Sequence, residues 1–269
     1  MASHSLSNVH PKAKIGANVV IEPFATIAKD VIIGDGTWVG PNAVIMDGAR
    51  IGSNCRIFPG AVISGIPQDL KFKGEITTAE IGNNTTIREC VTINRGTAAK
   101  GKTTVGDNCL IMAYVHIAHD CEVGSNIVLV NNVGLAGEVK IDDWAILGGA
   151  SVVHQFVHIG CHAFIAGASK VGKDVPPFVK AARDPLAYVG INSIGLRRRN
   201  YTSDKITEIQ DIYRIIFQKG MNYSDACEHI ETNMPASQER DEIVTFVRGS
   251  KRGIMKGYDA GDDEDHSVF

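Results

Sequence analysis

Aliphatic residues recur every six positions along most of the chain. Between Ile15 and Val171, in steps of six, 24 of 27 positions are Ile, Val or Leu, and the exceptions are Asp69, Glu75 and Ala99. Helices repeat about every 3.6 residues and strands about every two, so neither keeps this phase over so long a stretch. A constant period of this kind is typical of a solenoid built from short strands.

Small residues accompany the aliphatic positions. Glycine often follows directly, as in "IGDGTW" and "VGDNCL", and another small or apolar residue stands four places after the aliphatic one, as at Val19, Cys55 and Cys121. We therefore predict a parallel β-helix in which the aliphatic residues point inward and glycine or asparagine adopts the unusual backbone angles of the corners. In known hexapeptide-repeat proteins this helix is left-handed and three-sided, which gives eighteen residues per coil.

The rhythm is interrupted twice without losing its phase. Between Ile63 and Ile81 lies "SGIPQDLKFKGEITTAE", and between Ile93 and Val105 lies "NRGTAAKGKTT". Because both interruptions span whole hexads, we predict outward loops near residues 66–79 and 95–104. Such loops either have no role beyond covering the surface or form the rim of a pocket, because the flat wall of a prism has no pocket of its own.

The hexad pattern ends after Val171, near "VPPF", and a helical pattern begins at about Thr202. Ser203 or Asp204 can cap this helix, and Gly220 can end it. Shorter helices are predicted over "SDACEHIE" and "RDEIVTFV". The predicted organisation is a β-helix of hexapeptide repeats over 1–185, a small α-helical C-terminal domain over 186–257, and an acidic, disordered tail over 258–269.

Composition narrows the class of protein. The net charge of −3 argues against general nucleic-acid binding. No apolar run approaches the roughly 20 residues of a membrane-spanning helix, and "MASHSLS" lacks the layout of a secretory signal. The six cysteines form no CxxC pair. We therefore expect a cytoplasmic protein with reduced thiols and no metal site.

Polar residues gather where eighteen-residue coils stack them. In "MAYVHIAHDCEVG", His119 stands beside Asp120, and the next two coils place Gly137 and Gln155 in the column of His119. A carboxylate that orients an imidazole is the usual layout of a general base near neutral pH. A backbone N–H without a side chain, at Gly137, can stabilise negative charge on a carbonyl oxygen. The pattern favours acyl transfer without a covalent intermediate.

Other interpretations of this cluster remain open. A structural role is the default for a single histidine and is our expectation for His158 and His162. Zinc is a rival, because hexapeptide-repeat carbonic anhydrases hold it with three histidines, and a zinc-dependent lyase or hydratase would follow. Cys121 occupies an inward-facing position, where a thiol packs rather than reacts. A non-catalytic scaffold is a further alternative, but it predicts no column of aligned polar residues.

Seven motifs, in order, resemble one enzyme family. "QDLKF", "NRGT", "HIAHDCEVG", "LAGE", "VVHQF", "DVPPF" and "GLRRR" are similar, over essentially the whole chain, to the UDP-N-acetylglucosamine O-acyltransferases that begin lipid A synthesis. The resemblance implies transfer of a 3-hydroxyacyl chain from acyl carrier protein, with its phosphopantetheine thioester as co-substrate, to the sugar 3-hydroxyl. It also implies a homotrimer with active sites between subunits and no cofactor. The sister N-acyltransferases, which acylate a UDP-amino sugar, carry an additional domain before the repeats, which here begin at Ile15.

The resemblance also assigns roles to residues. It implies that His119 is the base, that Asp120 orients it and that Gly137 is the oxyanion donor. The residues implied to bind substrate are Gln68, Asp69, Lys71, Asn94, His116, Glu138, His154, Gln155, Gly167, Asn192, Arg198 and Arg199. The arginines of "LRRRN" suit a pyrophosphate and an acidic carrier, although a solvated helix start would have the same composition.

Four positions bear on substrate choice. Gly167 matches the position at which the family sets acyl length by side-chain size, so a glycine there implies a long chain. Asn94 and Glu138 stand where the family often has histidine, and Ile194 replaces a glutamate. These departures leave the acceptor open between a 3-hydroxyl and a 3-amino sugar.

Overall fold

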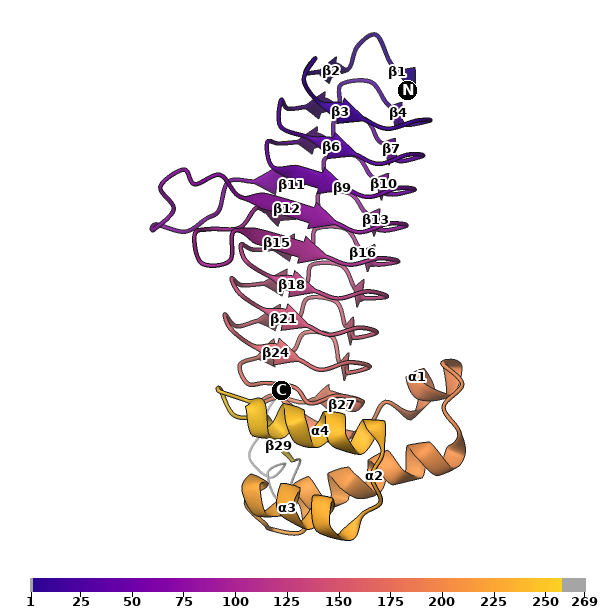
Figure 1. The fold of residues 1–269 in the computed structure, drawn as a ribbon, viewed down its shortest axis with the longest axis vertical. Helices are drawn as coiled ribbons and strands as arrows, with labels where there is room; N and C mark the ends of the chain where they lie inside the picture. Colours follow the sequence, from indigo (N-terminus) through magenta and orange to yellow (C-terminus); the bar gives the residue numbers. More distant parts are fainter. Residues whose placement is uncertain (1, 258–269) are drawn as a thin grey trace, which may run out of the picture.

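The strands of the chain wind into a long prism, and helices cover its C-terminal end (Figure 1). The structure, a computed structural model, describes residues 2–257, and within them it has 29 strands and four helices. The acidic tail predicted over 258–269 lies outside the described residues.

Each side of the prism is one sheet, and the chain visits the three sheets in turn. Sheet 1 contains β1 (Ala2–Ser3), β4 (Val20–Ile21), β7 (Trp38–Val39), β10 (Arg56–Ile57), β13 (Thr86–Ile87), β16 (Leu110–Ile111), β19 (Val128–Leu129), β22 (Ile146–Leu147), β25 (Phe164–Ile165), β27 (Val179–Ala182), β28 (Ala187–Ile191) and β29 (Lys256–Gly257). Sheet 2 contains β2 (Asn8–Val9), β5 (Thr26–Ile27), β8 (Val44–Ile45), β11 (Val62–Gly65), β14 (Thr92–Asn94), β17 (His116–Ile117), β20 (Gly134–Leu135), β23 (Val152–Val153) and β26 (Lys170–Val171). Sheet 3 contains β3 (Lys14–Ile15), β6 (Ile32–Ile33), β9 (Ala49–Ile51), β12 (Thr78–Ile81), β15 (Lys102–Val105), β18 (Glu122–Val123), β21 (Lys140–Ile141) and β24 (His158–Ile159). We name the edges corner 1–2, corner 2–3 and corner 3–1 after the sheets that they join.

Strands of neighbouring coils pair in parallel, eighteen residues apart, as the hexad pattern predicts. Ile117, for example, pairs with Leu135. Two pairings in sheet 2 span more of the chain: Ile63 pairs with Ile93, and Ile93 pairs with Ile117. The surplus is twelve residues in the first case and six in the second. Both are whole hexads, which is why the aliphatic phase survives the interruptions.

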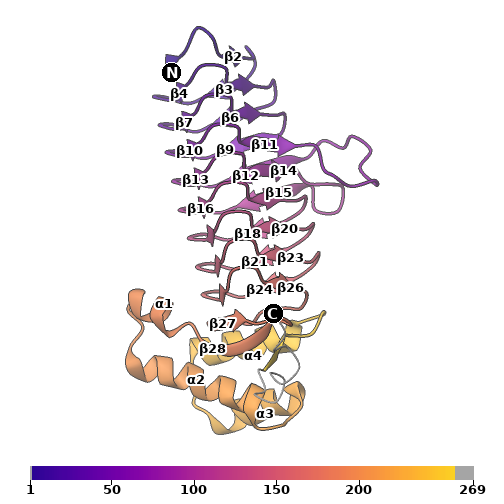
Figure 2. The same ribbon diagram turned by 180° about the vertical axis from the view of Figure 1, so that it is seen from behind.

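The surplus residues form two loops, 66–77 and 95–101, which leave the prism at corner 2–3. In both views the loops project from the same edge, on the side away from helix α1 (Figures 1 and 2). Each loop begins after a strand of sheet 2 and ends before a strand of sheet 3. The two irregular segments are therefore neighbours in space although they lie in different coils.

The aliphatic positions fill the interior of the prism. From Ile21 to Val171, every Ile, Val or Leu of the hexad series is at most 4% exposed. The second small position of each repeat is buried as well, as at Val19, Cys55 and Cys121. Each fully buried aliphatic side chain stabilises the fold by about 1.5–3 kcal/mol relative to an exposed one, so the interior holds the coils together.

The cysteines are unpaired, and five of the six are buried. Cys90 is the exception to the expected burial, because it is exposed at a corner, where the backbone turns at φ 56°.

The chain turns most corners through a left-handed residue three positions after the aliphatic one. Asparagine often fills this position, as at Asn54 and Asn108, with φ of 56° and 57°, because its side chain tolerates this conformation. Glycine adopts it at Gly36 (φ 70°). The glycines directly after the aliphatic residues do not adopt the left-handed angles, so the prediction is wrong for them. Glycine is needed there because the next coil comes close: a Cβ on Gly106 would lie 2.7 Å from the backbone of Gly124.

Four helices follow the prism, α1 (Ser193–Arg198), α2 (Ser203–Gln218), α3 (Tyr223–Asn233) and α4 (Gln238–Gly249). The predicted caps of α2 are wrong by one or two residues, because the Thr202 side chain accepts the Lys205 N–H and Ser203 is already helical. Gly220 follows the end of α2 at φ 68°, as predicted. No helix of the described residues is both long and apolar enough to cross a membrane.

The C-terminal helices are attached to the last coil of the prism. The Tyr213 side chain of α2 is fully buried, and its hydroxyl donates to the Pro177 carbonyl at 2.6 Å. The segment that we predicted to be helical also contributes strands: β28 pairs antiparallel with β27, and β29 pairs parallel with β28. The C-terminal region therefore extends sheet 1 as well as covering its end.

Candidate active site

Both loops and the predicted dyad share corner 2–3. His119 and Asp120 follow β17, whereas loops 66–77 and 95–101 follow β11 and β14 of the same sheet. The loops stand in the two coils before the histidine coil, and Gly137 and Gln155 stand in the two coils after it. The structure therefore stacks His119, Gly137 and Gln155 along one edge of the prism.

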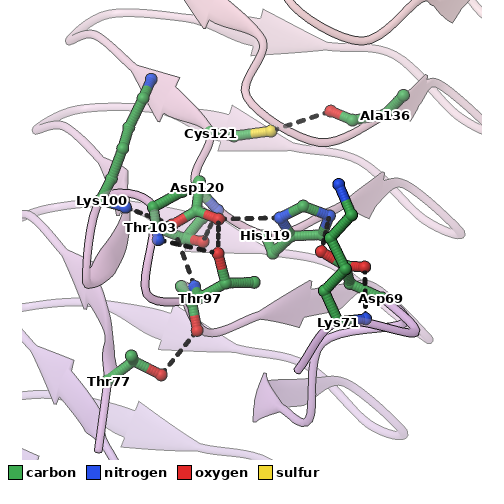
Figure 3. Close-up of polar contacts among 12 residues, drawn as sticks. Asp69, Lys71, Thr77, Thr97, Lys100, Thr103, His119, Asp120, Cys121 and Ala136 are labelled. Atoms are coloured by element: carbon green, nitrogen blue, oxygen red, sulfur yellow. Dashed lines mark hydrogen bonds and ion pairs between the residues drawn. The ribbon is translucent and has the colours of Figure 1, made fainter. Parts of the chain in front are cut away.

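His119 and Asp120 form a hydrogen-bonded pair at this corner (Figure 3). His119 Nδ1 lies 2.8 Å from Asp120 Oδ2; the Asp120 side chain is fully buried, and the His119 side chain is 11% exposed. When Nδ1 carries the proton that it donates to the carboxylate, the neutral imidazole keeps a lone pair on Nε2. This is the tautomer that a general base requires.

Loop 95–101 holds the other side of the Asp120 carboxylate. The Thr97 hydroxyl donates to Oδ2 at 2.6 Å, and the N–H groups of Thr97 and Lys100 donate to Oδ1 at 2.9 and 3.2 Å. Burial opposes ionisation of Asp120, but the hydrogen bonds from Thr97, His119 and Lys100 outweigh it and lower the pKa of this carboxyl. The Asp120 N–H in turn donates to Thr103 Oγ1 at 2.8 Å. Asp120 is therefore ionised at neutral pH and fixed in orientation.

Gly137 lies directly against the imidazole. A Cβ at this position would come within 2.6 Å of His119 Cε1 and 2.7 Å of Nε2. Within residues 2–257, the Gly137 N–H has no hydrogen-bond partner, whereas the following N–H, of Glu138, donates to the His119 carbonyl at 3.0 Å. The absence of a side chain is therefore required by the histidine itself, and the residue that lies against the ring has an unpartnered backbone donor among the described residues.

Loop 66–77 reaches the Nε2 edge of the imidazole, whereas Asp120 contacts Nδ1. Asp69 Oδ2 lies 3.9 Å from His119 Nε2, and Asp69 Oδ1 accepts the Lys71 N–H at 2.9 Å. Figure 3 shows Asp69 and Lys71 on the Nε2 side of the ring. Gln68 and Lys71 are exposed. The loop thus places an acid and a cation next to the predicted base.

Two further predicted site residues belong to strands of sheet 2 beside this corner. His116 Nδ1 lies 2.7 Å from Thr92 Oγ1, and burial lowers the pKa of His116, which favours its neutral form. Asn94 is buried; its Nδ2 donates to the Ile66 carbonyl at 3.2 Å, and its Oδ1 is buried without a partner among the described residues.

The coils after the histidine coil contribute the rest of this group. Glu138 turns the corner above Asp120 at φ 60°. His154 is exposed, and its Nδ1 lies 3.0 Å from the Gln155 carbonyl oxygen.

The remaining predicted residues lie elsewhere in the chain. Gly167 is at corner 1–2, between β25 and β26. Asn192 caps α1 with its side chain and donates through Nδ2 to the His162 carbonyl at 2.9 Å. Arg199 packs on Trp144 at corner 3–1, with its guanidinium 5.0 Å from the ring centroid, whereas Arg198 is exposed. One chain therefore does not bring these four residues next to His119.

The other histidines and cysteines have structural surroundings. His158 Nε2 lies 2.6 Å from Asp142 Oδ2, and burial lowers the pKa of His162 to about 4. The Cys121 thiol donates to the Ala136 carbonyl at 3.2 Å, and burial raises its pKa to about 12, which makes it a poor nucleophile. Across residues 2–257, no group of three or more His, Cys, Asp and Glu side chains is arranged to hold a metal ion.

Sequence reasoning missed three residues that hydrogen-bond to Asp120: Thr97, Lys100 and Thr103. Thr97 lies in a loop that breaks the hexad pattern, so coil arithmetic cannot place it over Asp120. Thr103 is an inward-facing, fully buried position of β15. The one sequence feature that could have pointed to Thr97 was the second interruption of the hexad pattern, because it lies in the coil directly before that of His119.

Comparison with known proteins gives a consistent match. A family model described as Udp N-acetylglucosamine O-acyltransferase, Domain 2, matches residues 174–255, and one for bacterial transferase hexapeptide repeats matches residues 30–65 and 102–137. An acyl-[acyl-carrier-protein]–UDP-N-acetylglucosamine O-acyltransferase from Burkholderia lata is 45% identical over 199 residues, which cover 72% of this chain and 76% of the relative.

Solved structures are similar over nearly the whole chain. The UDP-N-acetylglucosamine acyltransferase of Bacteroides fragilis is 52% identical, with a TM-score of 0.93, and the match covers 94% of this chain and 99% of that one. The acyltransferase of Francisella novicida is 44% identical, with a TM-score of 0.93, over 97% and 96% of the two chains. With the three parallel sheets, these matches confirm the predicted left-handed β-helix of hexapeptide repeats followed by C-terminal helices.

Proposed function

Because the chain belongs to the UDP-N-acetylglucosamine O-acyltransferase family, we propose that it transfers a long 3-hydroxyacyl chain from acyl carrier protein to the 3-hydroxyl of UDP-N-acetylglucosamine. This is the first step of lipid A biosynthesis. The observation that carries the proposal is the His119–Asp120 pair, in which a buried, ionised carboxylate fixes an imidazole whose Nε2 lies 3.9 Å from Asp69 of loop 66–77.

His119 acts as the general base in this proposal. Its Nε2 takes the proton of the sugar 3-hydroxyl while that oxygen attacks the carbonyl carbon of the thioester. Asp120 keeps the proton on Nδ1 and stabilises the imidazolium that forms. The Asp120 carboxylate remains ionised throughout, because its hydrogen bonds favour the charged form.

Gly137 stabilises the tetrahedral intermediate. Negative charge develops on the former carbonyl oxygen, and the unpartnered Gly137 N–H beside the imidazole can donate to it. When the carbon–sulfur bond breaks, the phosphopantetheine thiolate takes the proton from His119 and leaves as a thiol. The ester forms, and no acyl-enzyme is required.

Loop 66–77 and its neighbours bind the nucleotide sugar in this proposal. Asp69 and Lys71 lie on the Nε2 side of the His119 ring (Figure 3), and Gln68 is an exposed residue of the same loop. Lys71 supplies a positive charge suited to the pyrophosphate. Further contacts come from the same corner, from Asn94, His116, Glu138, His154 and Gln155.

A homotrimer completes the site. Gly167, Asn192, Arg198 and Arg199 lie on other corners of the same chain, so they can line the site of His119 only as part of a neighbouring subunit. Leu70 and Ile76, on loop 66–77, are 106% and 98% exposed in the single chain, and apolar side chains left so open favour burial against a second copy. The arginines then face the acidic carrier protein and the nucleotide.

We assign the reaction to the cytoplasm. Six unpaired cysteines are typical of a protein in a reducing compartment. The acyl carrier protein, with its phosphopantetheine thioester, is a co-substrate in this scheme, and the residues of the corner need no bound cofactor for the steps described.

Direct assay tests this function. Purified protein is incubated with UDP-N-acetylglucosamine and a panel of 3-hydroxyacyl carrier proteins, and ester formation is measured by mass spectrometry. We expect long-chain donors to be used, and we expect His119→Ala to reduce turnover by at least about a hundredfold with fold and oligomeric state unchanged.

Three results would contradict the proposal. Near-normal turnover of His119→Ala would remove the general-base mechanism. Product formed only with a 3-amino acceptor would show N-acylation instead, for which the departures at Asn94 and Glu138 are the motivating observation. Activity that requires stoichiometric zinc would point to a metal-dependent enzyme.

A further inference from the structure

Loop 95–101 is fastened to the prism rather than lying loose on it. The Gly96 N–H donates to the Thr78 carbonyl at 3.1 Å, and the Gly96 carbonyl accepts the Thr77 hydroxyl at 2.6 Å. At the other end, the Gly101 carbonyl accepts the N–H of Thr78, in β12, at 3.1 Å. These bonds fix the backbone of the loop relative to corner 2–3.

The Thr97 hydroxyl has one orientation available within this loop. Its oxygen accepts the Ala99 N–H at 3.2 Å, and the hydroxyl donates to Asp120 Oδ2 at 2.6 Å. Thr97 is only 7% exposed, so water offers little competition. The hydroxyl proton is therefore directed at the same carboxylate oxygen that accepts the His119 Nδ1 proton.

The two oxygens of Asp120 are held by different kinds of donor. Oδ1 accepts two backbone N–H groups of the loop, from Thr97 and Lys100. Oδ2 is shared by two side chains, His119 and Thr97. Without the hydroxyl, the imidazole would be the remaining partner of Oδ2, and rotation of the carboxylate would carry the His119 ring with it.

We infer that Thr97 is a positioning residue, whose hydroxyl fixes Asp120 so that His119 Nε2 points to the acceptor hydroxyl. The inference rests on the proposed general-base role of His119. Thr97 contacts neither Nε2 nor the exposed edge of the ring, so its removal affects the proton-transfer step and leaves substrate binding unchanged. Loop 95–101 is, on this account, part of the catalytic corner and not surface ornament.

Two substitutions separate the hydroxyl from the shape of the side chain. Thr97→Val removes the hydroxyl and keeps the branched shape, whereas Thr97→Ser keeps the hydroxyl. We expect Thr97→Val to lower kcat roughly tenfold to a hundredfold, the usual cost of losing a partner that orients a functional histidine. KM for both substrates should stay within about twofold, and Thr97→Ser should recover most of kcat.

Thr85→Val is the matched control. Thr85 is also fully buried, and its hydroxyl joins coils by donating to the Gly106 carbonyl at 2.9 Å and accepting the Cys109 N–H at 3.1 Å, but at corner 3–1. This variant should be less stable and keep the wild-type kcat. Thr97→Ala, which removes the same hydroxyl with less bulk, replaces the valine variant if that variant does not fold.

The kcat of His119→Ala is measured in the same experiment, so that failure of the inference about Thr97 can be told apart from failure of the proposed function. A wild-type kcat in the Thr97 variants, a serine variant as impaired as valine, or an equal loss in Thr85→Val overturns the positioning role. If His119→Ala is inactive in those cases, the proposed function still stands. If His119→Ala turns over normally, the general-base mechanism and the role of Thr97 fail together, although the transfer itself stands.

Discussion

Asp120 serves as a corner residue and as the partner of His119 at once. It turns the chain at φ 60°, a conformation that aspartate and asparagine adopt more readily than most residues. Because loop 95–101 covers this corner, the carboxylate is buried where four donors meet it. The backbone geometry that the fold requires at Asp120 therefore also produces the ionised carboxylate that the proposed base, His119, requires.

Gly137→Ala should impair catalysis more than stability. The new Cβ would lie 2.6 Å from His119 Cε1, so the imidazole must move away from its place between Asp120 and the corner. We expect kcat to fall at least about tenfold, since misplacement of a catalytic group by about 1 Å can cost a hundredfold. Steady-state kinetics with a long-chain donor measure this effect, and a wild-type kcat would show that His119 tolerates displacement.

Asp120→Asn should remove a pH-dependent part of the stability. Hydrogen bonds lower the pKa of Asp120 in the folded state, so the ionised carboxylate stabilises the fold above the unfolded-state pKa of about 3.9 and ceases to do so as the pH falls through the folded-state value. At pH 7 the variant should be less stable by about 1–3 kcal/mol, and the difference should shrink below about pH 4. Urea unfolding over this pH range provides the measurement, and a difference independent of pH would contradict the assignment.

Within each coil, the aliphatic residues and the glycines contribute to stacking in different ways. The aliphatic residue fills the interior, and the glycine after it lets the backbone of the next coil approach. At Gly106 that approach leaves 2.7 Å for a Cβ, whereas at Gly172, in the same position of a later repeat, no atom lies within 4 Å. A glycine after the aliphatic residue is therefore sterically required in one coil and not in another.

This contrast gives a matched pair of substitutions. Gly106→Ala should destabilise the protein by about 1–3 kcal/mol, because the backbone of Gly124 must shift to admit the methyl group. Gly172→Ala should be neutral or slightly stabilising, because the methyl group meets no neighbour and the unfolded chain loses freedom. Thermal and urea unfolding of both variants compare them, and equal stabilities would refute the stacking explanation.

At the scale of the whole molecule, the predicted site residues divide among the three corners. Corner 2–3 carries the dyad and the loops, corner 1–2 carries Gly167, and Arg199 packs at corner 3–1. A straight prism cannot bring its own corners together. In the homotrimer that we propose, copies packed side by side would join these corners, and a closed ring of three would give every copy the same environment.

Gly167→Met should change the preferred acyl length. A Cβ at this position would meet the Gly149 carbonyl oxygen at 3.2 Å, so the side chain must extend away from the prism wall. We expect kcat/KM for long donors to fall at least about tenfold while shorter donors are retained, as for a pocket shortened by several methylene groups. Competition between donors of different length measures the preference, and an unchanged profile would separate Gly167 from the acyl groove.

Mixed trimers test whether two subunits share one site. His119→Ala and Gly167→Met chains are each expected to be poorly active with a long donor, but unfolded and refolded together they would form interfaces that carry both native residues. Random mixing in equal amounts should restore about a quarter of wild-type activity. Activity no greater than that of the separate variants would contradict a site between subunits.

The sequence alone determined the six-residue repeat and, with the three-sided coil of known hexapeptide-repeat proteins, the column that contains His119 and Gly137. The repeat follows from periodicity, whereas the eighteen-residue coil came from the resemblance and is confirmed by the strand pairing, as between Ile117 and Leu135. The sequence also determined the starts of α2, α3 and α4 to within two residues, since caps and apolar stripes are local features, but it did not predict α1. Asp120 could be assigned as a partner of His119 because the two are adjacent in the chain.

The tertiary structure alone decided what the two loops do and which residues lie apart. Thr97 reaches Asp120 across 23 positions of sequence through a segment with no period, so neither pattern nor propensity could place it. The separation of Gly167 and Arg199 from His119 depends on which corner each occupies, and their proposed meeting depends on a second chain. Contacts between residues that are adjacent in the chain can be predicted from the sequence. Contacts made by irregular loops, and contacts between corners, form only once the coils have stacked.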